Sequence, residues 1–577
     1  MKTRRSRARI SLVVVALFAV VAAFTVRLVD IQLVQASELN AQSLTKRAQE
    51  QVLYGTRGEI LDTNGAVLAA SVERYDIEVS PRSALTRSDA ATSVPEALAK
   101  IAAITGQDPA ALMAVLTADP ESDFAYLAKS VKLDVFEEVR ALDIPWLYYE
   151  LRPSRAYPNG AVAGNLVGFI GTDGPQAGLE LSEDACLAST NGSATYEKGE
   201  DGVQLPGSLV TEVAPKDGGS VTLTIDRDLQ FYVQQRIAQT YTELGAEWAT
   251  AVVMRVSDGA LMAVADYPSV DPNNVDGVPN TALGSRAFSW PYEPGSTIKA
   301  LTAASLIDAG VATQTTQVVA PGRRYLENGD YIKDAWAHDD IPYTLAGALV
   351  DSSNVAVSMF SDLLPADRRH DYLTAFGFNA ETEVGFTGES EGVIHPAAEW
   401  DEVTNYAVQF GQGMSATSVQ VASAYQTLGN GGVRMPVTLV EGCRWPDGTT
   451  TDLPATEGTQ VVSATAARKT VEMLEQVVTK GWKAPDLMIP GYRVAAKSGT
   501  AQVAENGVYG DKAVISFAGL APADNPQYVV VVTAGIPSSI YSSGAIATTF
   551  RDVVAQTLTQ FRVTPSTEPA PDIPLTW

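Results

Sequence analysis

The stretch Glu293-Pro294-Gly295-Ser296-Thr297-Ile298-Lys299 decides how this chain is interpreted, because it sets a serine and a lysine three positions apart. Pro294-Gly295 predicts a turn, and the apolar-periodic residues 300–307 predict a helix that begins just after it. Positions i and i+3 of a helix share a face, so the Lys299 amine can lie beside the Ser296 hydroxyl. A desolvated lysine can take the proton of a serine and make it a nucleophile. The stretch therefore indicates a serine acyl-transfer site.

The pattern S-x-x-K is weak evidence by itself, and the chain contains a second copy of it. Ser43-Leu44-Thr45-Lys46 also fits, just past an apolar N-terminal segment, where nothing would activate the serine. Most such matches are solvated surface helices. Ser296 differs from this second copy because two further motifs follow it within the same domain-sized stretch of sequence.

These motifs are S-x-N and K-[ST]-G. Ser352-Ser353-Asn354 begins 56 residues after Ser296, and Lys497-Ser498-Gly499 begins 145 residues after Ser352. Each alone has an ordinary explanation, such as a helix cap or a surface lysine at the end of a strand. All three motifs in this order resemble penicillin-binding proteins and serine β-lactamases.

Other stretches narrow the resemblance to class B penicillin-binding proteins. Residues 57–62, 157–160, 168–171 and 178–180 resemble the N-terminal module of that class, and residues 410–417 and 517–522 resemble its transpeptidase domain. The likeness extends to about residue 562, with no glycosyltransferase module before it. The chain is thus similar to monofunctional peptidoglycan D,D-transpeptidases, and most similar to the division-type septal enzymes.

The resemblance implies a role for each motif residue. Ser296 would attack the carbonyl between two D-alanines of a peptidoglycan stem peptide, and Lys299 would accept its proton. Lys497 nearby would lower the pKa of Lys299. Ser352 would relay a proton between Lys497 and the leaving amine, and Asn354 would hold the substrate amide and orient Lys299. The amine of a second stem peptide would then resolve the acyl-enzyme and form the cross-link.

The K-[ST]-G stretch is implied to bind substrate. The backbone N–H groups of Ser296 and Thr500 would form an oxyanion hole, worth about 3 kcal/mol per donor. The hydroxyls of Ser498 and Thr500 would bind the terminal carboxylate, and Gly499 would leave room for substrate along the strand. β-Lactams are implied as ligands of the same site, and neither a cofactor nor a metal is implied.

Net charge and the scarcity of histidine and cysteine restrict the function classes. The formal charge is −26 over 577 residues, which argues against nucleic acid as a partner, because phosphate binding needs a basic face. The histidines, at positions 338, 370 and 395, follow no catalytic or metal-ligand pattern. The default interpretation of Cys186 and Cys443 is two unrelated cysteines, and a disulfide in an oxidising exterior is the alternative.

The N-terminal segment predicts a single-pass membrane anchor. Residues 10–26 carry no charge, which is about the minimum length for a bilayer span. Five basic residues precede the run and orient the N-terminus toward the cytoplasm, leaving the catalytic part extracellular. A cleaved signal peptide is the alternative, since Ala22 and Ala23 lie near the end of the run. Amphipathic sequence continues directly after it, which favours the anchor.

The remaining patterns predict an α+β protein. Asn64-Gly65 predicts a hairpin. Strand 221–225, helix 226–244 and strands 249–256 and 260–265 predict an antiparallel sheet with helices against it. The domains we expect are a cytoplasmic N-terminus (1–9), a transmembrane anchor (10–28), a stalk and non-catalytic pedestal of the dimerisation type (29–215), a penicillin-binding/serine β-lactamase-like transpeptidase domain (216–562) and a loose proline-rich tail (563–577).

Related functions share these motifs. A β-lactamase or D,D-carboxypeptidase delivers the acyl group to water, but the long N-terminal module argues against a free β-lactamase. A β-lactam sensor or a silent scaffold of the division machinery would keep the fold, although the intact motifs argue against silence. An elongation-type rather than septal role stays open. The resemblance implies a polytopic membrane glycan polymerase and division proteins as partners, contacted through the anchor and residues 45–215.

Overall fold

The chain divides into two units that interleave along the sequence. The computed structural model describes residues 2–38, 48–86, 92–197, 207–505, 508–536 and 542–577. Residues 1–56 and 189–218 form the first unit, and residues 57–188 and 219–577 form the second. The second S-x-x-K copy, Ser43 to Lys46, lies outside the described residues.

The first unit contains a long apolar helix and a small sheet. Helix α1 (Lys2–Val29) continues into a π-helical turn (Asp30–Val34). Within the described residues, the span Arg7–Val34 is the one helical segment long and apolar enough to cross a membrane, and none of it is buried. The apolar run identified in the sequence is therefore helical. Strands β1 (Ala48–Leu53), β10 (Gly192–Glu197) and β11 (Val210–Val213) form an antiparallel sheet in that order.

The second unit begins with a small lobe that has its own core. A three-stranded sheet of order β5-β4-β6 shares this core with four helices, and Ile77, Val79 and Leu98 are buried in it. Asp108 opens a helix there by accepting a 3.0 Å hydrogen bond from Ala110 N. The elements of this lobe are β4 (Tyr75–Val79), α3 (Pro81–Thr86), α4 (Val94–Thr105), α5 (Pro109–Ala118), β5 (Ala125–Val131), α6 (Leu133–Arg140) and β6 (Leu147–Leu151).

A six-stranded sheet joins early and late parts of the sequence. Its order is β21 (Thr450–Thr451), β20 (Val440–Arg444), β12 (Ser220–Leu223), β2 (Ile60–Leu61), β3 (Val67–Val72) and β7 (Ser154–Ala156). β2 pairs antiparallel with β3, which confirms the hairpin predicted at Asn64-Gly65. Buried Glu180 holds two arginines beside this sheet, with Oε2 2.8 Å from Arg57 Nε and Oε1 2.6 Å from Arg155 Nε.

A disulfide links Cys186 to Cys443, 257 residues apart. The default interpretation of two unrelated cysteines is therefore wrong. Cys186 lies on the short helix α9 (Asp184–Leu187) and Cys443 on β20, next to the first strand residues of β12. Gly219 makes room for the bridge, because a Cβ on it would lie 2.6 Å from Cys443 Sγ and 3.0 Å from Cys186 Sγ. Pairing at such separation depends on the fold and leaves no local pattern.

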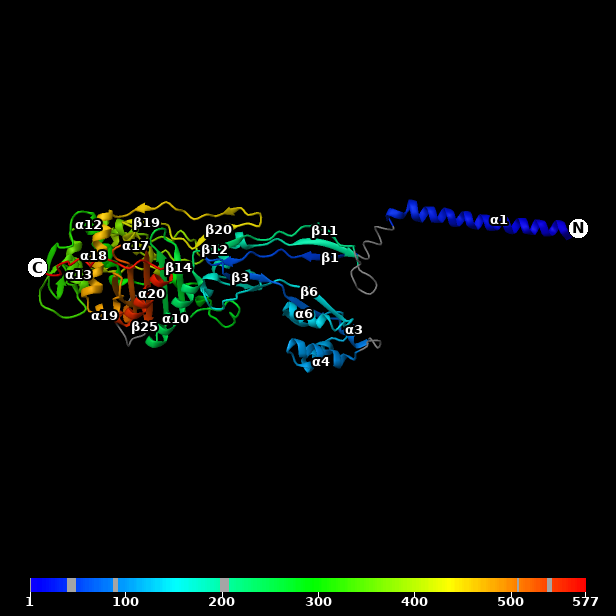
Figure 1. The fold of residues 1–577 in the computed structure, drawn as a ribbon, viewed down its shortest axis with the longest axis horizontal. Helices are drawn as coiled ribbons and strands as arrows, with labels where there is room; N and C mark the ends of the chain where they lie inside the picture. Colours follow the sequence, from blue (N-terminus) through cyan, green and yellow to red (C-terminus); the bar gives the residue numbers. More distant parts are fainter. Residues whose placement is uncertain (1, 39–47, 87–91, 198–206, 506–507, 537–541) are drawn as a thin grey trace. The chain divides into compact units, whose positions relative to one another are not determined.

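The domain that contains the three motifs is built on a five-stranded antiparallel sheet (Figure 1). Helices cover both faces, which confirms the predicted α+β fold. Alternate side chains of one strand enter two cores, Val529 and Val531 on one face and Val530 and Val532 on the other. The strand order is β14 (Leu261–Tyr267), β13 (Trp248–Arg255), β25 (Tyr528–Ile536), β24 (Val508–Ala521) and β23 (Ala495–Glu505). The covering helices are α10 (Arg227–Leu244) and α20 (Ala547–Gln560) on one face, and α12 (Lys299–Asp308), α17 (Ser418–Gly429) and α18 (Ala464–Lys480) on the other.

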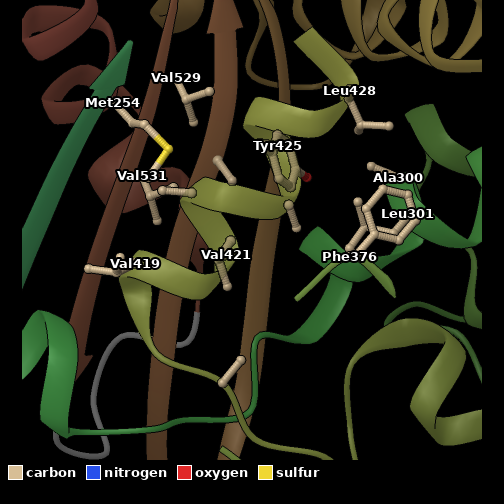
Figure 2. Close-up of a cluster of buried hydrophobic side chains, with 14 of the residues drawn as sticks. Met254, Ala300, Leu301, Phe376, Val419, Val421, Tyr425, Leu428, Val529 and Val531 are labelled. Carbon is tan, nitrogen blue, oxygen red and sulfur yellow. The ribbon is translucent and has the colours of Figure 1, made fainter. Parts of the chain in front are cut away.

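Helix α17 lies between the sheet and α12 (Figure 2). Its buried residues Val421 and Tyr425 pack between Met254 and Val531 of the sheet and Leu301 of α12. The Tyr425 hydroxyl also donates a 2.8 Å hydrogen bond to Thr297 O, in the turn before α12. This helix therefore fixes α12, and with it the S-x-x-K motif, relative to the sheet.

The proline-rich segment 563–577 is not loose, contrary to the prediction. Val563 and Ile573 are buried, and Gln476 Nε2 of α18 donates a 2.7 Å hydrogen bond to Pro571 O. Thr576 forms an antiparallel bridge with Tyr343. Proline lacks an N–H, but its carbonyl still accepts hydrogen bonds, so a proline-rich composition does not prevent docking.

Shorter elements connect these layers. They are α7 (Gly164–Val167), β8 (Ile170–Gly171), β9 (Gly174–Pro175), α8 (Gly178–Ser182), η2 (Asn280–Ala282), α11 (Arg286–Ser289), η3 (Gly295–Ile298), β15 (Gln317–Ala320), β16 (Arg323–Tyr325), β17 (Tyr331–Lys333), β18 (Ile341–Thr344), α13 (Leu345–Val350), α14 (Asn354–Ser361), α15 (Ala366–Ala375), η4 (Ala397–Glu399), α16 (Glu402–Ala407), η5 (Val408–Phe410), β19 (Val433–Arg434), β22 (Thr459–Gln460), α19 (Ala484–Leu487) and η6 (Ser543–Ile546).

Candidate active site

Ser296 lies on the 3-10 turn η3, directly before α12. The predicted helix therefore begins at Lys299, one turn after the serine. Gly295 adopts a φ of 56°, a conformation that favours glycine, and its N–H donates a 2.9 Å hydrogen bond to Gly411 O. Thr297 Oγ1 closes the turn by donating to Pro294 O over 2.8 Å.

The stretch 410–417 forms the support of this turn. A Cβ on Gly411 would lie 2.2 Å from Gly295 O, so the two backbones touch. Gly413 N donates a 2.8 Å hydrogen bond to Glu293 Oε1, and Ala416 exchanges two backbone hydrogen bonds with Tyr292. The sequence marked this stretch by resemblance alone, and its contacts give the physical reason for its glycines.

Gly499 also packs against this turn. A Cβ here would lie 2.4 Å from Ser516 Oγ and 2.7 Å from Pro294 O. Because Gly499 has no side chain, the turn that carries Ser296 can pack closely against β23. This packing reason differs from the room for substrate that we expected.

The two motif lysines meet at one serine hydroxyl. Lys299 and Lys497 are both fully buried. Lys497 Nζ lies 2.9 Å from Ser352 Oγ, and Lys299 Nζ lies 3.2 Å from the same atom and also donates to Ser352 O. Ser352 itself has a φ of 57°, a strained conformation for a serine and one that clusters at functional sites.

Burial changes the protonation of both amines. Burial, and after it the charge of Lys497, holds the pKa of Lys299 well below its usual value, although Asp334 opposes this. Burial also lowers the pKa of Lys497 to about 7. The sequence argument named the neighbouring charge as the cause for Lys299, but burial is the larger one. Lys299 therefore gives up its own proton more readily than an exposed lysine, which suits a group that must accept one from a serine.

The spacing predicts that the Lys299 amine can lie beside the Ser296 hydroxyl, but among the described residues no hydrogen bond joins the two. Among the described residues, Ser296 Oγ has no hydrogen-bond partner, and Lys299 Nζ is directed to Ser352 instead. Catalytic hydrogen bonds are often long in unliganded sites and shorten when substrate binds. Ser296 nevertheless lines the same cleft as Ser352, so substrate in that cleft would lie against both hydroxyls.

The S-x-N turn is held by an acid that sequence reasoning missed. Buried Asp334 accepts hydrogen bonds from Ser353 Oγ at 2.6 Å and from Val355 N at 3.0 Å, at the first turn of α14. His338 Nε2 lies 2.9 Å from the same carboxylate. Asp334 stands in a polar loop with no periodic pattern and no motif around it, so only the fold identifies it.

His338 carries the counter-charge of Asp334. Its Nδ1 lies 2.6 Å from Asp339 O, and its Nε2 faces the Asp334 carboxylate. A carbonyl oxygen and a carboxylate both accept hydrogen bonds, so this arrangement favours the protonated imidazolium form of the ring. Burial alone lowers the pKa of His338, but the hydrogen bonds to Asp339 and Asp334 outweigh it and raise the pKa above its usual value.

The motifs open onto one cleft of about 620 Å³. Its walls are formed by Ser296, Ala335, Trp336, Asp351, Ser352, Asn354, Trp482, Ser498, Thr500, Ser542 and Ser543. Five of the eight predicted site residues are among them, while Lys299 and Lys497 lie buried behind Ser352. Asn354 Nδ2 donates to Lys333 O over 3.3 Å, and among the described residues no hydrogen bond joins Asn354 to Lys299. The aromatic walls Trp336 and Trp482 were not predicted.

Two protein families match this chain along most of its length. The family described as "Penicillin binding protein transpeptidase domain" matches residues 249–555, and "Penicillin-binding Protein dimerisation domain" matches residues 52–223. The protein named penicillin-binding protein PbpB from Mycobacterium tuberculosis is 34% identical over 94% of this chain and 84% of its own length. The chain belongs to the class B penicillin-binding proteins.

Other penicillin-binding proteins are similar over comparable lengths. The peptidoglycan D,D-transpeptidase FtsI from Escherichia coli is 29% identical over 90% of this chain and 86% of its own length. A crystal structure of penicillin binding protein 3 from Mycobacterium tuberculosis complexed with ampicillin superimposes with a TM-score of 0.71 and 30% identity, and covers 91% of this chain and 100% of that one. In this penicillin-binding protein, therefore, the two lysines and Ser352 lie within the transpeptidase domain of the family.

Within the parts of the chain that the structure describes, no group of three or more His, Cys, Asp or Glu side chains could hold a metal ion.

Proposed function

We propose that this chain is a membrane-anchored serine D,D-transpeptidase that cross-links peptidoglycan stem peptides and is inhibited by β-lactams. One observation carries the proposal most strongly: Lys299 and Lys497, both buried, converge on Ser352 beside the cleft that Ser296 lines. The relatives named peptidoglycan D,D-transpeptidase FtsI and the ampicillin complex of a similar protein support the substrate and the inhibitor class.

In the proposed acylation, Ser296 Oγ attacks the carbonyl carbon of the penultimate D-alanine while neutral Lys299 takes its proton. The backbone N–H groups of Ser296 and Thr500 stabilise the oxyanion. As the tetrahedral intermediate collapses, the peptide C–N bond breaks, and the leaving D-alanine amine receives a proton through Ser352, which both lysines contact. The ester on Ser296 and free D-alanine are the products.

The second half-reaction reverses these proton transfers. The amine of an acceptor stem peptide attacks the ester carbonyl, loses its proton toward the same lysine–serine pair, and forms the new amide as Ser296 is released. During acylation the hydroxyls of Ser498 and Thr500, which line the cleft, hold the terminal carboxylate of the donor, which then leaves with D-alanine. In both halves Asn354 holds the donor amide. The acceptor approaches through the open part of the cleft.

The test is labelling of the full chain, solubilised in detergent, with a fluorescent penicillin. We expect stable labelling of the wild type and none of Ser296→Ala. The matched control is Ser305→Ala on α12, the helix that follows Ser296. Among the described residues, Ser305 Oγ bonds only to Leu301 O, and it does not line the cleft. Rapid loss of label would indicate a β-lactamase instead. A folded wild type that takes no label would contradict acyl transfer and favour a scaffold.

We further propose that the enzyme acts in septal synthesis, with α1 as a single-pass anchor, residues 1–9 cytoplasmic and the cleft extracellular. The similarity to PbpB and FtsI and the apolar span Arg7–Val34 support this assignment. A polytopic membrane glycan polymerase is the partner we expect, contacted through the anchor and residues 45–215. Exchange of α1 for an unrelated span should abolish co-purification of the polymerase, and unchanged co-purification would contradict that contact. Depletion of the protein should produce filaments, whereas rounded cells would indicate elongation.

A further inference from the structure

The docked tail reaches the element that precedes the S-x-N motif. Thr344 N donates a 3.0 Å hydrogen bond to Leu575 O, and Thr344 Oγ1 donates to Pro574 O over 2.7 Å. Trp577 N donates to Pro342 O over 3.3 Å. The tail thus adds a short antiparallel segment beside β18, and Figure 1 shows the end marked C close to α13.

The tail backbone also approaches Gly347 of α13 closely. A Cβ on Gly347 would lie 1.9 Å from Leu575 O and 3.2 Å from Leu575 Cα. No side chain fits that space without displacing the backbone of either element. Thr344 caps the same helix by accepting a 3.0 Å hydrogen bond from Gly347 N, and its hydroxyl donates to the tail. The backbone of the tail therefore lies in direct contact with the backbone of α13.

Helix α13 leads directly into the strained Ser352. Asp351 N donates to Gly347 O and Ser353 N donates to Ala348 O, each over 3.0 Å. Tyr343, which bridges to the tail, donates its hydroxyl to Asp351 Oδ2 over 2.9 Å. A shift of α13 would thus move Ser352 relative to Lys299 and Lys497, which come from other elements.

The other part of the tail is attached to α18. Lys480 Nζ pairs with the Asp572 carboxylate and donates a 3.0 Å hydrogen bond to Ile573 O. Gln476 of the same helix donates to Pro571 O. Helix α18 packs against α13 and against β23, the strand that carries Lys497. The tail therefore connects the helix beside Lys497 with the helix that carries Ser352.

We propose that residues 571–577 are a positioning element of the active site, which holds α13 so that Ser352 stays within hydrogen-bonding distance of both lysines. This inference rests on the proposed acyl transfer at Ser296. If it is right, the tail affects the acylation rate although it neither lines the cleft nor contains one of the three motifs. Because the tail contacts α13 and not the residues that line the cleft, its removal should change the acylation step more than the initial binding of penicillin.

The experiment compares the wild-type chain with a variant that ends at Ala570. Stopped-flow labelling separates the dissociation constant of the first penicillin complex from the rate constant of acylation. We expect the dissociation constant to stay within about twofold and the rate constant to fall about 10- to 100-fold, because misplacement of a catalytic group by about 1 Å has effects of that order. Thermal unfolding at each condition establishes that the labelled protein is folded.

The second part is a double-mutant test that does not depend on truncation alone. Gly347→Ala in the whole chain should slow acylation by about the same factor, since the methyl group displaces Leu575. In the truncated chain Gly347→Ala should cause no further loss, because nothing remains for the methyl group to displace. Gly284→Ala is the matched control, since a Cβ there meets nothing within 4 Å. Additive losses from the two changes would overturn the coupling of the tail to α13.

Lys480→Met tests the other attachment if the truncated chain melts below the assay temperature. We expect it to slow acylation with an unchanged dissociation constant. Wild-type acylation rates in folded Lys480→Met and Gly347→Ala would overturn the inference. Failure of the proposed function is distinguishable, because the wild type itself would then take no label on Ser296.

Discussion

Lys497 Nζ lies 2.9 Å from Ser352 Oγ, and both the amine and the neighbouring Lys299 are shut off from water. A buried lysine prefers to be neutral, since burial penalises the charged form. The contact is thus a hydrogen bond between the Ser352 hydroxyl and an amine that can gain or lose a proton near neutral pH. That property is what a proton relay needs, and it also affects stability.

The lowered pKa of Lys497 predicts how stability changes with pH. The folded state releases the proton at about 7 and the unfolded state at about 10.5, so between these values unfolding takes up a proton. The free energy of unfolding should therefore rise with pH by up to about 1.4 kcal/mol per unit above about pH 7, and the contribution should be flat below it. Urea unfolding at a series of pH values measures this slope.

Lys497→Met should remove the Lys497 part of the slope, because the variant lacks that amine. The lowered pKa of Lys299 leaves a slope of its own in both proteins. Lys333→Met is the control, since Lys333 is exposed on β17 and its loss should leave the slope unchanged. If wild type and Lys497→Met gave the same slope between about pH 7 and pH 10, the lysine would be charged in the folded protein.

The buried acid Asp334 predicts a defect in the S-x-N turn. Asp334→Ala leaves Ser353 Oγ and Val355 N without their acceptor and His338 without its counter-charge. We expect a loss of about 3–5 kcal/mol of stability, as for other broken buried pairs, and slower acylation. Asp334→Asn keeps one acceptor oxygen and should recover part of both. Asp340→Asn, exposed in the same segment, should match the wild type. Full acylation by folded Asp334→Ala would contradict a positioning role.

Much of the site could be predicted because its motifs are local. Pro294-Gly295 and the periodic residues after it predict the turn and helix that hold Ser296, and Asn64-Gly65 predicts its hairpin. Each of these signals lies within a few residues of the structure it produces. The convergence of Ser352 and Lys497 followed from resemblance, since no local pattern brings together residues 145 positions apart.

The features that sequence reasoning missed depend on long-range contacts. Asp334 matters because it binds the N-terminal turn of α14. The tail is held in place by hydrogen bonds from Thr344 and Gln476. The cysteines pair because the fold brings them together, and Gly219 leaves room for the bridge. The direction of the Lys299 pKa shift could be predicted from its neighbour Lys497. That burial is the larger cause could be seen only in the packed structure around Lys299.

The disulfide predicts a redox-dependent stability. Cys186 comes from the region that matches the dimerisation family, and Cys443 from the region that matches the transpeptidase family. Replacing both by serine should cost about 2–4 kcal/mol, since the bridge restricts the unfolded chain. A reductant should lower the melting temperature of the wild type toward that of the double variant and leave the double variant unchanged. Acylation at room temperature should be preserved, because neither cysteine lines the cleft. Equal melting temperatures of oxidised and reduced wild type would contradict this contribution.

Gly499→Ala distinguishes two reasons for a glycine in the third motif. If the glycine leaves room for substrate, the added methyl group should weaken penicillin binding and leave the melting temperature unchanged. The structure predicts the reverse: the methyl group meets Pro294 O at 2.7 Å and pushes the Ser296 turn away from β23. We therefore expect a lower melting temperature and an acylation rate constant reduced about 10- to 100-fold, with a smaller change in the dissociation constant. Gly510→Ala on β24 is the matched control, because a Cβ there approaches nothing closer than Val503 O at 3.9 Å. A folded Gly499→Ala variant of wild-type stability that only binds penicillin more weakly would restore the first explanation.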